Sequence, residues 1–352
     1  MHIRIFVGTG GVGKTSVAAA SALKAALEGK RCLVLTIDPA QRLRTALNLG
    51  QGGLEQKVDL GSLSMAGGLW AGLLDAGATL DRAVHLYGEP EQAETVLKHP
   101  VYHSLRQSMA GMQELMAIER IDQAITDGFE YLFIDTAPSR HAFEFLDKPE
   151  FFAELVSIPL LRFVGKTYKW LEGSILSNLG RKSVELYAKV EELLGANLVR
   201  QVLDFYSVFR TIAEGYADRA RRTSRLLHDP GITSFTVVTT PFKAIRDANY
   251  FLGELDKRKF STGTLIVNRI WPEVAAMPAE GNGSGRAGSL VTWYRSVSEA
   301  HHRTWDRISG EFASRFPTML ALPELARDVD GLSALNQIAR QLAALDQQPI
   351  DD

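Results

Sequence analysis

The chain has 352 residues, of which 45% are hydrophobic and 23% are charged, so it can form a sizeable core, and intrinsic disorder is excluded as its overall state. Its formal net charge is -2 and its pI is ≈ 6.5, which excludes the basic excess of a typical nucleic-acid-binding protein. The single cysteine, Cys32, excludes an internal disulfide and any cysteine pair that would hold zinc.

Strand and helix patterns alternate in the first part of the chain. Strands are expected at 2–7, 31–38, 69–76 and 131–138, and the Ala- and Leu-rich segment 14–30 is expected to be a helix that ends near Gly29. This alternation predicts an α/β fold with a mostly parallel sheet covered by helices on both faces.

Two long helical segments interrupt the alternation, and strand patterns return at 234–241, 261–270 and 318–323. We therefore predict a discontinuous core of residues 1–78, 128–148 and 229–352. The inserted helical subdomain comprises 79–127 and 149–228. The Gly-, Ser- and Ala-rich stretch 275–290 is expected to be a flexible loop.

A phosphate-binding motif follows the first strand. Gly8 to Thr15, GTGGVGKT, fits the P-loop pattern G-x-x-x-x-G-K-[ST] and stands between a predicted strand and a predicted helix. Backbone amides of such a loop cradle phosphates, the lysine reaches the β- and γ-phosphates, and the threonine hydroxyl binds Mg²⁺. The motif predicts a P-loop NTPase in which ATP and Mg²⁺ contact Gly10, Gly11, Val12, Gly13, Lys14, Thr15 and Ser16.

Two aspartates end predicted strands, Asp38 in LTIDPA and Asp135 in FIDTAP. The carboxyl ends of parallel strands line the ligand crevice of such a sheet, so both carboxylates are expected near the loop. Asp135 is the candidate metal-side carboxylate, and Asp38 is the candidate for orienting or deprotonating water, with a place among the metal ligands as well. The alternative for each is a turn residue at a strand end.

These motifs together resemble a known family. GTGGVGKTS, TIDPAQRL, FIDTAPSRHAFEFL and VNR, in this order, are similar to the arsenite-pump and tail-anchored-protein-targeting ATPases, which are dimerising P-loop ATPases. The resemblance implies a homodimer, or a heterodimer with a related ATPase, that closes over two ATP molecules. It implies that Asp38 acts on the attacking water and that Asp135 begins the second switch. It further implies that Asn268 reads adenine, while Pro323 and Glu324 lie against the base.

The chain departs from the family pattern at Thr9, where the family has a lysine that reaches the partner's nucleotide. Three explanations stay open: a local arginine substitutes (Arg140, Arg42 or Arg44), hydrolysis is slow, or a different chain supplies the lysine. We favour Arg140 as the catalytic substitute. The chain also lacks the cysteines of the family's zinc and arsenite sites, so arsenite stimulation is not expected.

The predicted helical subdomain has two apolar features. Met109, Met112 and Met116 recur at helical spacing, and residues 151–176 are rich in large apolar side chains. Together they could form a groove for a hydrophobic client, as the resembled targeting proteins do, or ordinary packing.

We expect a cytoplasmic Mg²⁺-dependent ATPase whose nucleotide state controls a client or partner protein. The alternative is a nucleotide-binding subunit with little hydrolysis of its own, paired with a lysine-bearing homologue. No secretion signal or membrane-spanning run is seen, and the acidic C-terminus allows at most peripheral membrane association. A P-loop kinase or ligase would explain neither the IDPA motif nor the helical insertions.

Overall fold

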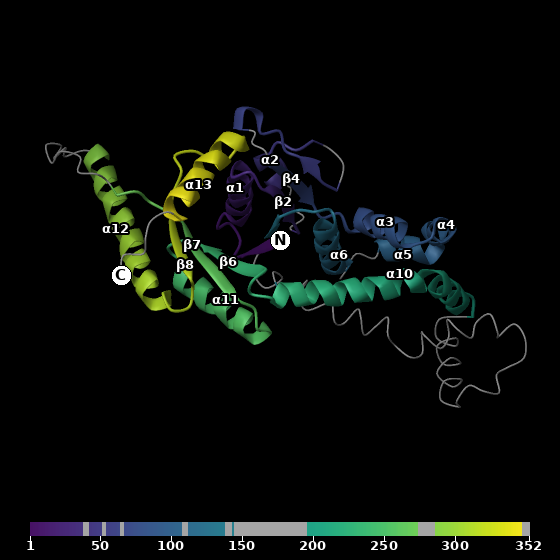
Figure 1. The fold of residues 1–352 in the computed structure, drawn as a ribbon. Coiled ribbons are helices and arrows are strands. Elements are labelled where there is room, and N and C mark those ends of the chain that lie inside the picture. The colour runs from purple at the N-terminus through teal and green to yellow at the C-terminus, as the bar shows by residue number, and fades with distance from the viewer. Residues whose placement is uncertain are drawn as a thin grey trace, which may run out of the picture. The chain divides into compact units, whose positions relative to one another are not determined.

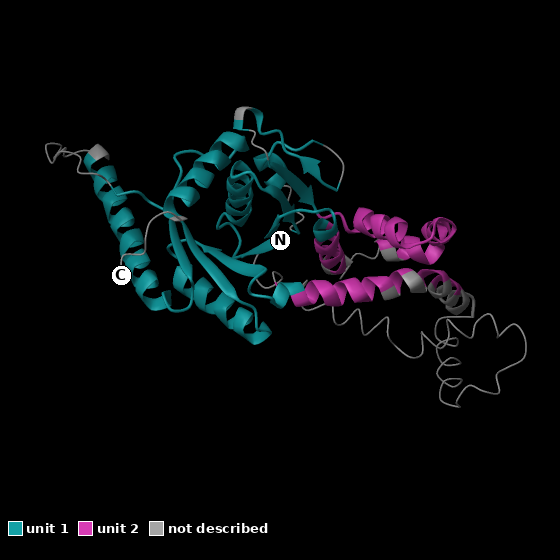
Figure 2. Cartoon of the chain, viewed as in Figure 1, with its two compact units in different colours: residues 1–73, 124–142, 226–352 teal, residues 74–123, 143–225 magenta. Residues whose placement is uncertain are grey.

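A computed structural model describes residues 1–37, 42–50, 54–63, 67–107, 112–137, 143, 196–273 and 286–346. The chain divides into two compact units, each of them discontinuous in sequence (Figure 2). The first unit comprises Met1–Leu73, Ala124–Ala142 and Leu226–Asp352, and the second comprises Leu74–Gln123 and Phe143–Arg225.

Within the described residues, the first unit is built on an eight-stranded sheet with the order β3-β4-β2-β5-β1-β6-β7-β8. Neighbouring strands are parallel except for the pair β3–β4. The prediction of an α/β fold with a mostly parallel sheet is therefore confirmed. The strands are β1 His2–Val7, β2 Arg31–Thr36, β3 Gln56–Lys57, β4 Gly68–Leu73, β5 Tyr131–Asp135, β6 Thr233–Thr239, β7 Thr262–Ile270 and β8 Thr318–Pro323.

Helices cover the sheet because the central strands are apolar on both faces. The N-terminal helix α1 (Lys14–Leu27) and the C-terminal helix α13 (Gly331–Asp346) pack against each other (Figure 1). Both helices share a core with Phe6, Phe133 and Ile266 of the sheet. Helix α11 (Ala244–Arg258) packs against β6 and β7. This arrangement leaves the carboxyl ends of the strands as the edge where a ligand crevice forms.

Three further elements complete the described part of the first unit: α2 (Arg42–Ala46), the short 3₁₀ helix η1 (Gly61–Leu63) and α12 (Arg286–Phe312). Helix α12 begins inside the stretch 275–290, the expected flexible loop, and residues 274–285 lie outside the described residues.

The described part of the second unit is helical. Its helices are α3 Ala76–Tyr87, α4 Pro90–Lys98, α5 Pro100–Gln107, α6 Met112–Thr126 and α10 Ala196–His228, of which α6 and α10 extend a few residues beyond the unit's bounds. Asp75 caps α3 by accepting a hydrogen bond from the amide of Ala78 at 2.9 Å, and α4 begins with a proline, which is favoured in the first turn.

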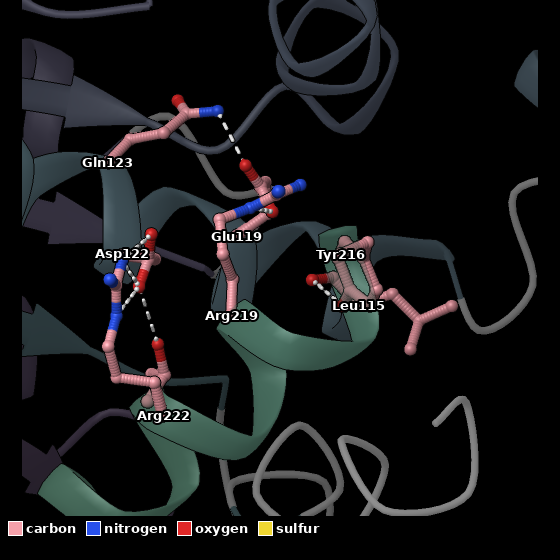
Figure 3. Close-up of polar contacts among 8 residues, drawn as sticks. Leu115, Glu119, Asp122, Gln123, Tyr216, Arg219 and Arg222 are labelled. Carbon is pink, nitrogen blue, oxygen red and sulfur yellow. Dashed lines mark hydrogen bonds and ion pairs between the residues drawn. The ribbon is translucent and has the colours of Figure 1, made fainter. Parts of the chain in front are cut away.

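Two parallel ion pairs join α6 and α10 within this unit (Figure 3). Arg219 Nε lies 3.1 Å from Glu119 Oε2, and Arg222 Nη2 lies 2.6 Å from Asp122 Oδ1. Both carboxylate side chains are buried, at 0% and 1% exposure. The two acids and the two arginines are each three residues apart, so one face of each helix carries both partners.

The apolar features of the helical segments are described only in part. Met116 is 3% exposed and belongs to the core, whereas Met109, residues 151–176 and the side chain of Met112 lie outside the description. Among the helices of the described ranges, none has the length and apolar character needed to cross a bilayer.

Candidate functional site

The loop between β1 and α1 has the backbone conformation that its glycines predict. Gly11 and Gly13 adopt left-handed φ values of 78° and 92°, which other residues adopt only at a cost. Helix α1 begins directly after Gly13, at Lys14. Its free N-terminal amides and the positive end of its dipole therefore lie next to the loop, an arrangement that favours an anion.

The loop lysine is held by the loop itself. Lys14 Nζ donates to the carbonyl oxygens of Gly8 at 3.0 Å and of Thr9 at 3.2 Å, and the residue is 7% exposed. The ammonium group therefore lies at the loop, where a phosphate would enter.

Asp135 meets the start of α1 at the end of β5. Thr15 Oγ1 donates to Asp135 Oδ2 at 2.7 Å, and Thr36 Oγ1, at the end of β2, donates to the same oxygen at 3.1 Å. The structure thus brings Thr15 and Asp135 together, as the sequence predicts, and adds Thr36. Strand order explains the addition: β2 pairs with β5, and Thr36 stands opposite Asp135 in that register.

The donor set at this point fits Mg²⁺. A threonine hydroxyl and an aspartate carboxylate are the hard oxygen ligands that Mg²⁺ prefers, and Mg²⁺ is typically held by one or two carboxylates together with substrate phosphates. Among the described residues there is no cluster of three or more acidic, histidine or cysteine side chains that would hold a metal independently of nucleotide.

Asn268 contacts the phosphate loop from the other side. Its Nδ2 donates to the carbonyl oxygen of Val12 at 2.8 Å, and a Cβ on Gly13 would collide with the same amide nitrogen. The next residue, Arg269, has a left-handed φ of 66°, which is unusual outside glycine, and its Nε lies 3.8 Å from Glu324 Oε2.

These elements surround a cleft of about 540 Å³, which is large enough for a nucleotide's phosphates and sugar. A small adjoining cavity of about 50 Å³ is bordered by Asn268, Pro323 and Glu324. The structure therefore brings these three predicted residues to the loop. The cleft is lined by Gly10, Gly11, Gly13, Lys14, Thr15, Ser16, Arg42, Thr45, Ala46, Arg269, Asp328 and Val329.

Two predicted catalytic residues, Asp38 and Arg140, lie outside the described residues. Of the other arginines considered as substitutes for the missing lysine, Arg42 lines the cleft, whereas Arg44 is not among its lining residues. Arg269 also lines the cleft, and its place there is not predictable from the sequence, because an arginine after a strand carries no signal of its own.

Thr9 makes its hydrogen bond inside its own chain. Its Oγ1 donates to Asp247 Oδ2 at 2.8 Å, and Thr239 Oγ1 donates to the same oxygen at 3.1 Å. Asp247 is 2% exposed and stands in the first turn of α11. Sequence reasoning missed this contact because Asp247 is 238 residues from Thr9 and belongs to no motif.

A phosphate loop at the end of β1, a helix N-terminus behind it and a buried aspartate on the adjacent strand define a P-loop nucleotide-binding protein. Residues 1–344 match the family described as anion-transporting ATPase, and the chain belongs to this family. It is therefore a nucleotide-binding ATP hydrolase, and the resemblance stated from the motifs is confirmed.

Named relatives agree with this assignment. The chain is 23% identical over 283 residues to putative arsenical pump-driving ATPase 2 of Aquifex aeolicus (strain VF5), covering 78% of this chain and 81% of that protein. It is 25% identical over 285 residues to ATPase GET3 of Eremothecium gossypii, covering 76% and 72%. The arsenical pump-driving ATPase of Escherichia coli is 28% identical over 151 residues, which are 41% of this chain and 25% of that protein.

Proposed function

We propose that the chain is a Mg²⁺-dependent ATPase that hydrolyses ATP at an interface between two subunits and couples its nucleotide state to binding of a client or partner protein. The observation that supports nucleotide binding is the hydrogen bond between Thr15 and Asp135, at a cleft that Lys14 and Thr15 line. The subunit interface and the client rest on the resemblance of the motifs to dimerising ATPases.

Each residue has a role that follows from its chemistry. Loop amides bind the β-phosphate, and Lys14 exchanges its bonds to the Gly8 and Thr9 carbonyls for bonds to the phosphate oxygens. Thr15, Asp135 and Asp38 would hold Mg²⁺, which neutralises phosphate charge when it is bound. Asp38 orients the attacking water and accepts its proton, and Asn268, Pro323 and Glu324 hold the adenine.

The cation that stabilises the transferring phosphoryl group is the open element of this mechanism. Arg140 is the proposed substitute for the lysine that Thr9 replaces, and Arg42 lines the cleft as a second candidate. Such cations are worth several orders of magnitude in rate. The inward bond of Thr9 favours a second candidate function, a nucleotide-binding subunit with little hydrolysis of its own that acts with a lysine-bearing homologue.

Steady-state hydrolysis of Mg-ATP, measured over a wide range of protein concentrations, tests the proposal. Asp38→Asn and Lys14→Ala serve as blanks, and sedimentation at the same concentrations identifies the species present. We expect the rate per subunit to rise with concentration and then level off as the dimer forms.

A rate per subunit that exceeds the blanks but stays constant while the monomer converts to dimer contradicts hydrolysis between subunits. A rate equal to the blanks throughout favours the second candidate, because the chain then needs a partner. Asp38→Asn turnover near the wild-type rate would remove Asp38 from the mechanism.

A further inference from the structure

The carboxylate of Asp247 is buried and accepts hydrogen bonds from two threonine hydroxyls on other segments of the chain. Both Thr9 Oγ1, on the phosphate loop, and Thr239 Oγ1, at the end of β6, donate to its Oδ2, and Arg246 Nε lies 3.7 Å from its Oδ1. A buried carboxylate without partners is unfavourable, and hydrogen bonds to charged groups are stronger than those between neutral groups. The hydrogen bonds to Asp247 therefore strongly restrain the segments on which Thr9 and Thr239 stand.

Asp247, Thr239 and Thr9 differ in how firmly the fold holds them. Asp247 belongs to the first turn of α11, where the helix dipole favours a negative charge, and Thr239 ends a strand of the central sheet. Thr9 is the one member that stands on a loop. The bond between Thr9 and Asp247 therefore restrains the loop, because helix and strand fix the other two residues.

What the bond restrains is the part of the loop that holds Lys14. The carbonyls of Gly8 and Thr9 accept the hydrogen bonds of Lys14 Nζ, and Gly8 lies so close to the Val238 carbonyl that a Cβ there would overlap it. The start of the loop is thus fixed on two sides, by β6 beneath Gly8 and by Asp247 at Thr9. A shift of Thr9 would displace the lysine and the amides that follow.

We propose that Asp247 anchors the phosphate loop through Thr9, which makes Thr9 a positioning residue for nucleotide binding within its own chain. This inference rests on the nucleotide-binding role of the loop and does not depend on a dimer or a client. It also assigns position 9 a role that a neutral side chain performs, in place of the absent cation.

Three substitutions separate positioning from general stability. Thr9→Val removes the hydroxyl while keeping the side-chain shape, and Thr9→Ser restores it. Thr239→Val is the matched control, because it removes the other hydroxyl from the same carboxylate oxygen without touching the loop. Mg-ATP affinity is measured by calorimetry on the full chain, and the nucleotide-free unfolding midpoint is measured in parallel.

We expect Thr9→Val to weaken Mg-ATP binding about tenfold, which corresponds to about 1.4 kcal/mol. Thr9→Ser should bind within about twofold of wild type, whereas Thr239→Val should lower the unfolding midpoint and leave the affinity within about twofold. Thr9→Ala provides the same loss of the hydroxyl should the valine variant fail to fold.

The anchor is contradicted if the valine and alanine variants bind Mg-ATP like wild type, or if Thr239→Val weakens binding as much as Thr9→Val. In the latter case the cluster only stabilises the fold. Because affinity is measured on a single chain, these outcomes are distinguishable from failure of hydrolysis at a subunit interface.

Discussion

At the scale of single residues, Gly13 has to satisfy two conditions at once. Its φ of 92° is in the left-handed region, and the space where a Cβ would stand is taken by the Asn268 amide nitrogen. Gly11 satisfies only the first condition, since its φ is 78° and nothing lies within 4 Å of the equivalent position. Comparing substitutions at the two glycines therefore distinguishes the effect of backbone strain from the effect of a steric clash.

We expect Gly13→Ala to lose measurable Mg-ATP binding and to destabilise the fold by about 2–4 kcal/mol, because it combines left-handed strain with displacement of Asn268. Gly11→Ala should cost only the strain, about 1–2 kcal/mol. Urea unfolding and calorimetric titration of both variants measure this difference. Equal effects of the two substitutions would show that the contact with Asn268 is unimportant.

Part of this site is predictable from the sequence, because its signals lie in short motifs and the elements that flank them. The loop motif, with its flanking strand and helix, predicts the positions of Lys14 and Thr15, and strand ends predict that Asp135 lies beside them. The partners Asp247 and Thr239 were not predictable, since ordinary Asp and Thr residues acquire a role only through contacts across the fold.

At the scale of elements, the pairing of α6 with α10 depends on buried charge. Burial raises the pKa of the Glu119 carboxyl above its ordinary 4.5, and Arg219 only partly offsets this. A raised pKa means that the folded protein holds the proton more tightly than the unfolded chain does. The contribution of Glu119 to stability is therefore fully present below pH 4.5 and is lost as pH rises through the raised pKa.

Glu119→Gln removes this titration while keeping the shape of the side chain, and its amide oxygen can still accept the hydrogen bond of Arg219. We expect the variant to gain stability relative to wild type above pH 4.5, by up to about 1.4 kcal/mol per pH unit across the interval between the two pKa values. Urea unfolding from pH 4 to pH 7 measures the difference.

Glu94→Gln is the control, since Glu94 on α4 is exposed and Lys98 lowers its pKa. Glu94→Gln should be slightly less stable than the wild type at neutral pH, and this small difference in unfolding free energy should disappear as pH falls. If the wild type instead becomes more stable than Glu119→Gln as pH rises, the ion pair with Arg219 outweighs the cost of burying the carboxylate.

Prediction of the elements succeeded where the apolar pattern was long. The runs at 2–7, 131–138 and 318–323 are mostly apolar, and all contain strands. The two-residue strand β3 was missed, since Gln56 and Lys57 show no strand pattern and only pairing with β4 defines them. Likewise, the start of α12 at Arg286 was hidden by the glycines that precede it.

At the scale of the whole molecule, several relatives are named for arsenical pumps, but this chain has a single cysteine. Cys32 is buried in β2, and burial raises the pKa of its thiol to about 12. Soft metal and metalloid ions are bound by thiolates, which this residue does not provide near neutral pH.

We therefore expect arsenite and antimonite to leave ATP hydrolysis within about 20% of the untreated rate, because no thiolate is available to bind them. Hydrolysis by wild type and by Cys32→Ala, each with and without the metalloid, tests this. Stimulation in wild type that disappears in the alanine variant would show that the thiol is reached. Stimulation in both would point to a site without cysteine.

The anchor at residue 9 also has an evolutionary consequence. In this chain a single change of Thr9 to lysine would place an ammonium group against the buried Asp247 carboxylate, where an internal ion pair would hold it. Positions 9 and 247 are therefore expected to change together among relatives of this chain.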